Sequence, residues 1–185
     1  MFIQTEATPN PSTLKFLPGR DVLPSGMGVT EFKSASEAQN SPLASALFAI
    51  EDVSGVFFGG DFISVTKADG DWQLLKPSIL GAIMEHFTSG QPMFLKAASV
   101  ENDAFLGDES LEIVDTIKEL LETRIRPAVA SDGGDIALRG YKDGIVYLSM
   151  KGACSGCPSS TATLKNGIQN LLRHFLPEVQ SVEQI

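Results

Sequence analysis

Two segments in the second half of the chain carry apolar residues at helical spacing. In each of them the apolar positions recur every three or four residues, which predicts an amphipathic helix. Pro127 is expected to close the first helix, while the second begins at Pro158 and is stopped by Pro177. The apolar positions are Leu111, Val114, Ile117, Leu121 and Ile125 in the first segment, and Leu164, Ile168, Leu171, Leu172 and Phe175 in the second.

Runs typical of β-strands lie between and after these two helices. Residues 136–138 and 145–150 are apolar and rich in β-branched side chains, and the Lys-Asp-Gly turn at 142–144 joins them. Residues 131–135 predict a turn before the first strand, and residues 179–185 predict a last strand at the sheet edge. The order helix, strand, strand, helix, strand is that of an α+β domain with helices packed on one sheet.

The first half of the chain predicts a second, smaller mixture of strands and helices. It opens with turn-rich sequence and contains β-branched and aromatic runs bounded by Gly and Pro. Two apolar segments that follow a proline predict helices, and Gly90 is placed to end the second of them. The predicted strands are 13–17, 53–58 and 62–66, and the predicted helices are 43–50 after Pro42 and 79–87 from Pro77.

The charge distribution separates these two halves. Residues 97–122 hold eight acidic side chains and one basic side chain, a net charge of −7. The first part of that stretch has no hydrophobic periodicity, which indicates a solvated linker rather than a docking element. The sequence therefore predicts two small α/β domains, residues 1–96 and 109–185, joined by an acidic linker at 97–108.

Composition narrows the function classes. The chain has 185 residues, a net charge of −9 and 43% hydrophobic residues, the balance of a soluble globular protein. An acidic chain repels phosphate backbones, which argues against nucleic acid, and no apolar run is long enough for a membrane span. Two cysteines and an N-terminus without signal features predict a bacterial-type cytoplasmic protein, or a mitochondrial matrix protein if a presequence was removed.

The two cysteines form one motif. Cys154 and Cys157 are separated by Ser-Gly and lie between a predicted strand and the helix that starts at Pro158. The positive end of that helix, with Lys151 nearby, is expected to favour thiolates. Gly152 and Gly156 allow the backbone to come close to whatever the sulfurs hold. Two thiolates on a loop at a helix N-terminus are therefore predicted to be reactive or to bind metal.

Three chemistries fit a Cys-x-x-Cys pair. Thiol–disulfide exchange fits the spacing, but no βαβ run leads into the motif. Structural zinc needs four ligands, and His174 is too far along its helix while His86 is in the other predicted domain. An iron–sulfur cluster fits if two chains each supply two thiolates.

The wider sequence resembles the Nfu family of iron–sulfur scaffold proteins. The segments that carry the resemblance are residues 131–135 and 152–160, similar to the C-terminal NifU domain, and residues 2–11 and 14–19, similar to the N-terminal Nfu domain. The resemblance implies a non-enzymatic carrier that binds a cluster between two subunits and transfers it to apo-proteins. Its implied ligands are Cys154 and Cys157, and its cluster is [4Fe–4S], with [2Fe–2S] as the alternative.

The resemblance also implies partners. They are a second copy of the chain, apo iron–sulfur client proteins and upstream assembly factors. Independently of the resemblance, the N-terminal domain has no cysteine and no catalytic grouping, so it is expected to select clients or partners. Asp132 and Asp135 are expected to be turn residues beside glycines rather than metal ligands. The competing hypothesis is an enzyme, a thiol–disulfide oxidoreductase that uses the same two cysteines.

Overall fold

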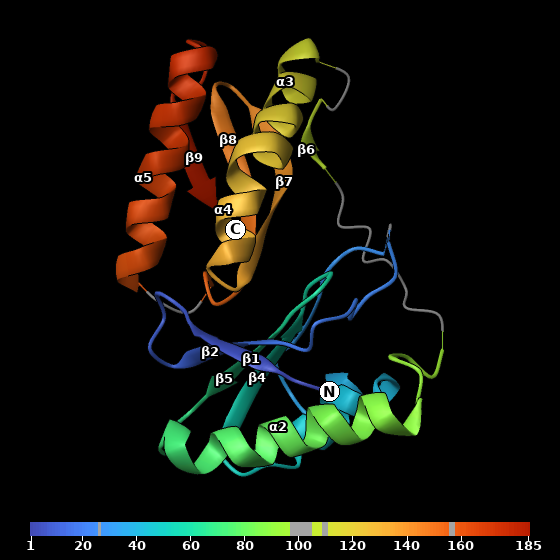
Figure 1. Cartoon of the computed structure of the whole chain (residues 1–185). Helices are drawn as coiled ribbons and strands as arrows, with labels where there is room; N and C mark the ends of the chain where they lie inside the picture. Colours follow the sequence, from blue (N-terminus) through green and yellow to red (C-terminus); the bar gives the residue numbers. More distant parts are fainter. Residues whose placement is uncertain (26, 97–104, 109–110, 156–157) are drawn as a thin grey trace. The chain divides into compact units, whose positions relative to one another are not determined.

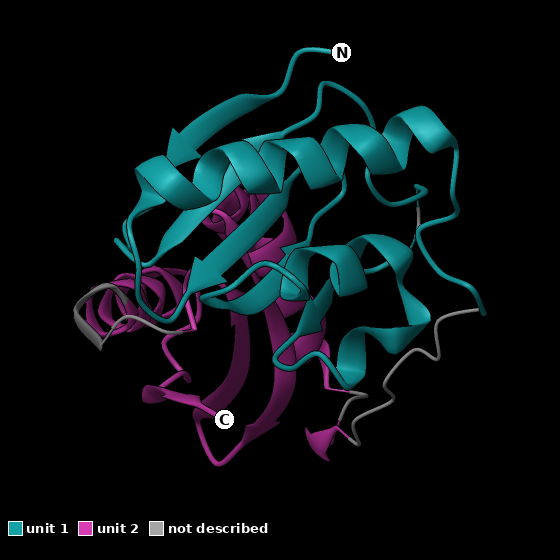
Figure 2. Cartoon of the chain, turned by 90° about the horizontal axis from the view of Figure 1, so that it is seen from below, with its two compact units in different colours: residues 1–100 teal, residues 101–185 magenta. Residues whose placement is uncertain are grey.

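The chain forms two compact units, residues 1–100 and 101–185 (Figures 1 and 2). The computed structural model describes residues 1–25, 27–96, 105–108, 111–155 and 158–185. Most of the expected linker therefore lies outside the described residues. Its described part, residues 105–108, contains a short strand, β6 (Leu106–Gly107), which the charge pattern did not predict.

The first unit is a five-stranded antiparallel sheet with helices on one face. The sheet order is β1-β2-β5-β4-β3. Phe16, Ile63 and Val65 on the sheet share a core with Ile79 and Ile83 of the long helix α2. The elements are β1 (Gln4–Ala7), β2 (Thr13–Leu17), β3 (Thr30–Phe32), η1 (Glu37–Asn40), α1 (Pro42–Phe48), β4 (Val53–Phe58), β5 (Ile63–Lys67) and α2 (Trp72–Ser89).

The predicted strands and short helix of this unit are present, but two strands were missed. Strand β1 is largely exposed, and β3 has three residues, so neither shows a clear alternation of buried and exposed positions. The prediction that α2 begins at Pro77 is wrong. Asp71 caps the helix by accepting a hydrogen bond from the Gln73 amide at 2.9 Å, so the helix starts five residues earlier and includes Pro77. Gly90 ends it in the left-handed conformation, as predicted.

His86 is a buried polar residue on the inner side of α2. It is 5% exposed, and its Nε2 atom has no hydrogen-bond partner among the described residues. Burial lowers the pKa of this imidazole from its ordinary value of 6.5. The folded unit therefore holds His86 in its neutral form at a pH where the unfolded chain would protonate it.

Replacing His86 with Leu is expected to stabilise the first unit by about 1 kcal/mol, because the orphaned nitrogen is removed. A lowered pKa in the folded state means that stability is lost as the pH falls below 6.5, so the gain from His86→Leu should grow between pH 7.5 and 5.5. Urea unfolding followed by the fluorescence of Trp72, the single tryptophan, measures this. The exposed His174→Leu change is the control, and equal pH profiles for wild type and His86→Leu would contradict the prediction.

The second unit is a four-stranded sheet with helices, in the order β6-β7-β8-β9. Strands β7 and β8 are antiparallel, while β6 and β9 run parallel to their neighbours at the two edges. The mixed α+β class predicted from the sequence is confirmed. The elements are β6, α3 (Glu112–Leu120), η2 (Leu121–Ile125), α4 (Arg126–Ser131), β7 (Gly134–Lys142), β8 (Ile145–Gly152), α5 (Pro158–Phe175) and β9 (Ser181–Gln184).

The prediction that Pro127 closes the first helix of this unit is wrong. A π-helical turn, η2, lets the Arg126 amide bond to the Leu121 carbonyl, one residue farther back than in an α-helix. Pro127 then occupies the first turn of α4, where its missing N–H needs no partner. The helical path consequently continues to Ser131 and ends directly before β7. Within the described residues, every helix is too short or too polar to span a lipid bilayer.

Candidate functional site

Cys154 lies just beyond the end of β8, on the loop that leads to α5. It is only 6% exposed and packs within the apolar core of the second unit. It forms no disulfide. Cys157, the second predicted ligand, lies outside the described residues. The structure therefore places one member of the predicted pair.

The backbone before Cys154 is fixed by a tight turn at Gly152. Gly152 has a φ of 70°, a left-handed conformation that favours glycine. Its carbonyl accepts hydrogen bonds from both the amide and the hydroxyl of Ser155, at 3.1 and 2.9 Å. The Ala153 amide donates to the carbonyl of Gly133 at 3.2 Å, which ties the loop to the turn between α4 and β7. The cysteine loop is thus held at both its start and its middle.

Two further contacts position Cys154 itself. The Thr161 hydroxyl of α5 donates to the Cys154 carbonyl at 2.9 Å. On the other side, a Cβ atom placed on Gly134 would lie 2.9 Å from the Cys154 Sγ atom and 2.6 Å from the Lys151 carbonyl oxygen. Only glycine fits at position 134 without displacing the sulfur or the strand. The sequence predicts Gly134 within the turn at 131–135 and does not single out Thr161, because the proximity of both to Cys154 arises from strand pairing and helix packing.

Asp135 is not the turn residue that the sequence predicted. It is 6% exposed, belongs to β7 and accepts two hydrogen bonds from the Arg126 guanidinium, at 2.8 and 2.9 Å. Arg126 also pairs with Glu122. Hydrogen bonding to Asp135 raises the pKa of Arg126 further above its ordinary value. Asp132, by contrast, lies in the turn after α4, as predicted.

The surroundings of Cys154 favour its protonated thiol. Burial, together with the smaller effect of the Asp132 and Asp135 carboxylates, raises the pKa of Cys154 to about 11. The sequence predicted thiolates at this motif because of the helix dipole. For Cys154 the opposite holds, because burial and two neighbouring carboxylates both disfavour a negative sulfur.

The described residues contain no group of three or more His, Cys, Asp or Glu side chains that is suited to hold a metal ion. His86 belongs to the first compact unit and His174 to the second. Among the described residues, Cys154 is the cysteine that could ligate a metal, and its thiol is free. Complete coordination of a cluster would need further thiolates, and Cys157 and a second copy of the chain are the sources that the sequence predicts.

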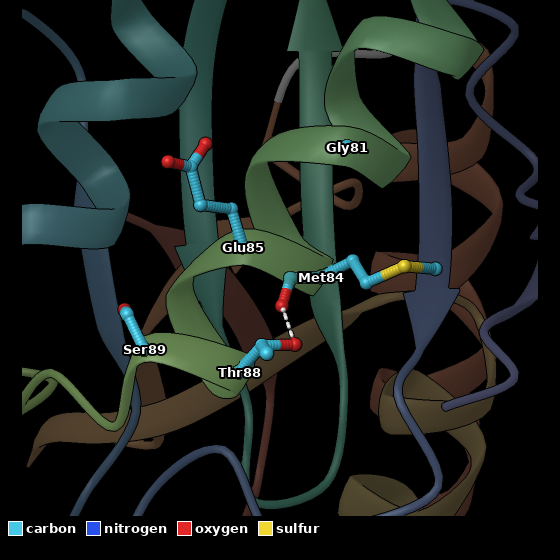
Figure 3. A pocket seen from close by; sticks show the side chains of 5 residues that line it. All are labelled: Gly81, Met84, Glu85, Thr88 and Ser89. Carbon is cyan, nitrogen blue, oxygen red and sulfur yellow. Dashed lines mark hydrogen bonds between the residues drawn. The ribbon is translucent and has the colours of Figure 1, made fainter.

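Two surface hollows lie in the first unit. One, of about 400 Å³, is on α2 and is lined by Gly81, Met84, Glu85, Thr88 and Ser89 (Figure 3). The Thr88 hydroxyl in this hollow donates to the Met84 carbonyl at 2.7 Å, so its proton is already used in a hydrogen bond within the helix. The other, of about 410 Å³, is lined by residues 21–24, Met27 and residues 92–96. Neither lining contains a cysteine or a histidine, so neither offers the ligands that a cluster needs.

Comparison with known proteins assigns both units to described domains. Residues 3–90 match the domain described as "Scaffold protein Nfu/NifU N terminal", and residues 117–183 match the "NifU-like domain". A protein of Arabidopsis thaliana named "NifU-like protein 5, mitochondrial" is 52% identical over 188 residues, which cover all of this chain and 68% of the relative. The chain belongs to the Nfu/NifU family.

Other Nfu/NifU relatives are longer than this chain. "NFU1 iron-sulfur cluster scaffold homolog, mitochondrial" of Drosophila virilis is 55% identical over 187 residues, which cover all of this chain and 62% of the relative. The chain thus spans less than two thirds of that relative. Among solved structures, a NifU-like protein of Saccharomyces cerevisiae, determined by NMR, matches with 28% identity and a TM-score of 0.47, covering 52% of this chain and 86% of its own.

Proposed function

We propose that this Nfu/NifU chain holds an iron–sulfur cluster between two subunits and transfers it to apo client proteins. The ligands would be Cys154 and Cys157 of each subunit. The observation that carries the proposal is the cysteine loop of the NifU-like domain, in which Gly152, Gly134 and Thr161 hold Cys154 between β8 and α5. The names of the Drosophila relatives, which call them iron–sulfur cluster scaffold homologues, support the same function.

The number of thiols supports a shared cluster. Iron–sulfur clusters are commonly ligated by four thiolates, and one chain contains two cysteines. Two copies that meet at their cysteine loops supply a full ligand set. We propose [4Fe–4S] as the cluster, with [2Fe–2S] as the alternative type. The cluster is the cargo of the protein, which acts as a carrier and not as an enzyme.

Release follows from the chemistry of ligation. The high pKa of Cys154 means that its sulfur loses a proton when iron binds and regains one when iron leaves. Incoming thiolates of a client can then replace the carrier's ligands one at a time. Because Cys154 is buried in the single chain, ligation also requires its sulfur to become accessible at the subunit contact.

The remaining assignments extend the same proposal. The first unit, which has no cysteine, would select clients or upstream assembly factors. The Drosophila and Arabidopsis relatives are named as mitochondrial proteins, which favours the mitochondrial matrix over the bacterial-type cytoplasm as the location of this chain. A chain of residues 101–185 that transferred clusters to every client as fast as the full chain would argue against client selection by the first unit.

Anaerobic reconstitution with iron and sulfide tests the central proposal. We expect the full chain to gain broad visible absorption, a Mössbauer signature of a cluster, and the mass of a dimer. Cys154→Ser should abolish the chromophore and the cluster-dependent dimer together, while leaving the metal-free fold intact. A colourless monomer that reduces a model disulfide would instead favour the oxidoreductase. A holo-protein that is one subunit, with its metal fully ligated from within, would overturn the shared site.

A further inference from the structure

The ion pair of Arg126 and Asp135 connects helix α4 to the first residues of β7, directly beside the cysteine loop. Both guanidinium–carboxylate hydrogen bonds are short, at 2.8 and 2.9 Å, and the carboxylate is almost fully buried. Asp135 pairs in the sheet with Lys151, and the preceding Gly134 pairs with Gly152. Asp135 is therefore one residue away from the glycine whose missing Cβ makes room for the Cys154 sulfur.

Asp135 directly follows Gly134 and pairs in the sheet with Lys151, three residues before Cys154, while Asp132 lies in the turn just before this strand. Both carboxylates therefore lie near the Cys154 sulfur, where their charge disfavours further negative charge. A cluster ligated by four thiolates is itself negative, so both carboxylates would oppose its retention. The Arg126 guanidinium contacts Asp135 directly and neutralises part of its field, while the Arg126 side chain is itself only partly exposed. Water screens a pair of this kind less than it screens a surface pair.

We propose that Arg126 and Asp135 set how tightly the cysteine loop holds its cluster. In this assignment, which rests on the proposed function, Asp135 promotes release by its negative charge. Arg126 limits that effect by pairing with it. Neither residue is a ligand: both are positioning residues that act through the electrostatic field at Cys154. The pair thereby sets the balance between cluster retention and cluster release.

Three variants separate this role from a purely structural one. Asp135→Asn should slow cluster loss to an iron chelator by about tenfold and raise the reduction potential of the cluster, even though it weakens the fold. Arg126→Gln should accelerate cluster loss and lower the potential. In Arg126→Gln/Asp135→Asn both changes should largely cancel, because the buried charge and its partner are removed together. Opposite effects on fold stability and on cluster retention in Asp135→Asn are the signature of a field effect.

The pair Lys165–Glu183, on α5 and β9, provides the matched control. Lys165→Gln removes one cation from the same unit and should leave chelator kinetics and the potential unchanged. If Asp135→Asn loses its cluster faster than wild type, or if all variants share the wild-type potential, the assignment is wrong. A wild-type chain that assembles no cluster would instead overturn the proposed function, so the two failures are distinguishable.

Discussion

Gly134→Ala is expected to destabilise the second unit by about 2 kcal/mol and to displace Cys154. The new Cβ would lie 2.6 Å from the Lys151 carbonyl oxygen and 2.9 Å from the Cys154 Sγ atom. The carbonyl belongs to β8, in register with Asp135 of β7, so it cannot retreat without disturbing the strand pair. The thiol is the more movable of the two atoms and would turn away from its buried position.

Urea unfolding followed by circular dichroism measures the stability, and the rate of alkylation measures the exposure of Cys154. The control is Gly167→Ala, on the exposed side of α5, where an added Cβ meets no atom within 4 Å. That change should be neutral or stabilise the unit by up to about 1 kcal/mol, because alanine has the higher helix propensity. Equal stabilities for the two variants would contradict the close packing at Gly134.

Alkylation of Cys154 in the metal-free chain is expected to be about 100-fold slower at pH 8 than that of an ordinary cysteine. The pKa of Cys154 is raised from 9.0 to about 11 by burial and by two carboxylates, and the thiolate is the reactive form. The rate should therefore rise steeply up to about pH 11. Iodoacetamide labelling of the Cys157→Ser variant, which retains Cys154 alone, measures this rate without interference from the second thiol.

The same raised pKa has a consequence for stability. A thiol whose pKa is higher in the folded state keeps its proton while the unfolded chain has lost it, so stability falls as the pH rises from about 9 to about 11. Cys154→Ala should lose this part of the pH dependence. Labelling of Cys154 at the rate of a denatured control at pH 8 would show that the sulfur is not buried in solution.

Slow reaction at Cys154 also bears on the competing enzymatic hypothesis. A thiol–disulfide oxidoreductase depends on a thiolate near neutral pH. The environment of Cys154 works against that form. Cys154 is thus poorly suited to nucleophilic attack near neutral pH. Binding of a metal ion does not need a preformed thiolate, because coordination itself displaces the proton from the thiol.

The organisation of the second unit could be predicted from sequence because it follows from local patterns. Apolar residues at helical spacing define α3 and α5, and alternation with turn residues defines β7 and β8. The predicted helix boundaries are wrong where contacts outside the local pattern decide where a helix begins or ends. Pro127 was expected to end a helix, but a π-helical turn accommodates it. Pro77 was expected to begin one, but the cap at Asp71 lies earlier.

The sequence by itself determined the α+β class, the family, and the Cys-x-x-Cys motif between a strand and a helix, because each depends on residues that are close along the chain. Only the tertiary structure decided the environment of Cys154. Its burial, its contact with Gly134 and the carboxylates near it depend on strand pairing and on a turn that brings α4 next to β7. The Arg126–Asp135 pair joins residues nine positions apart on different elements. No local pattern specifies such contacts, because they form only when the helices pack on the sheet.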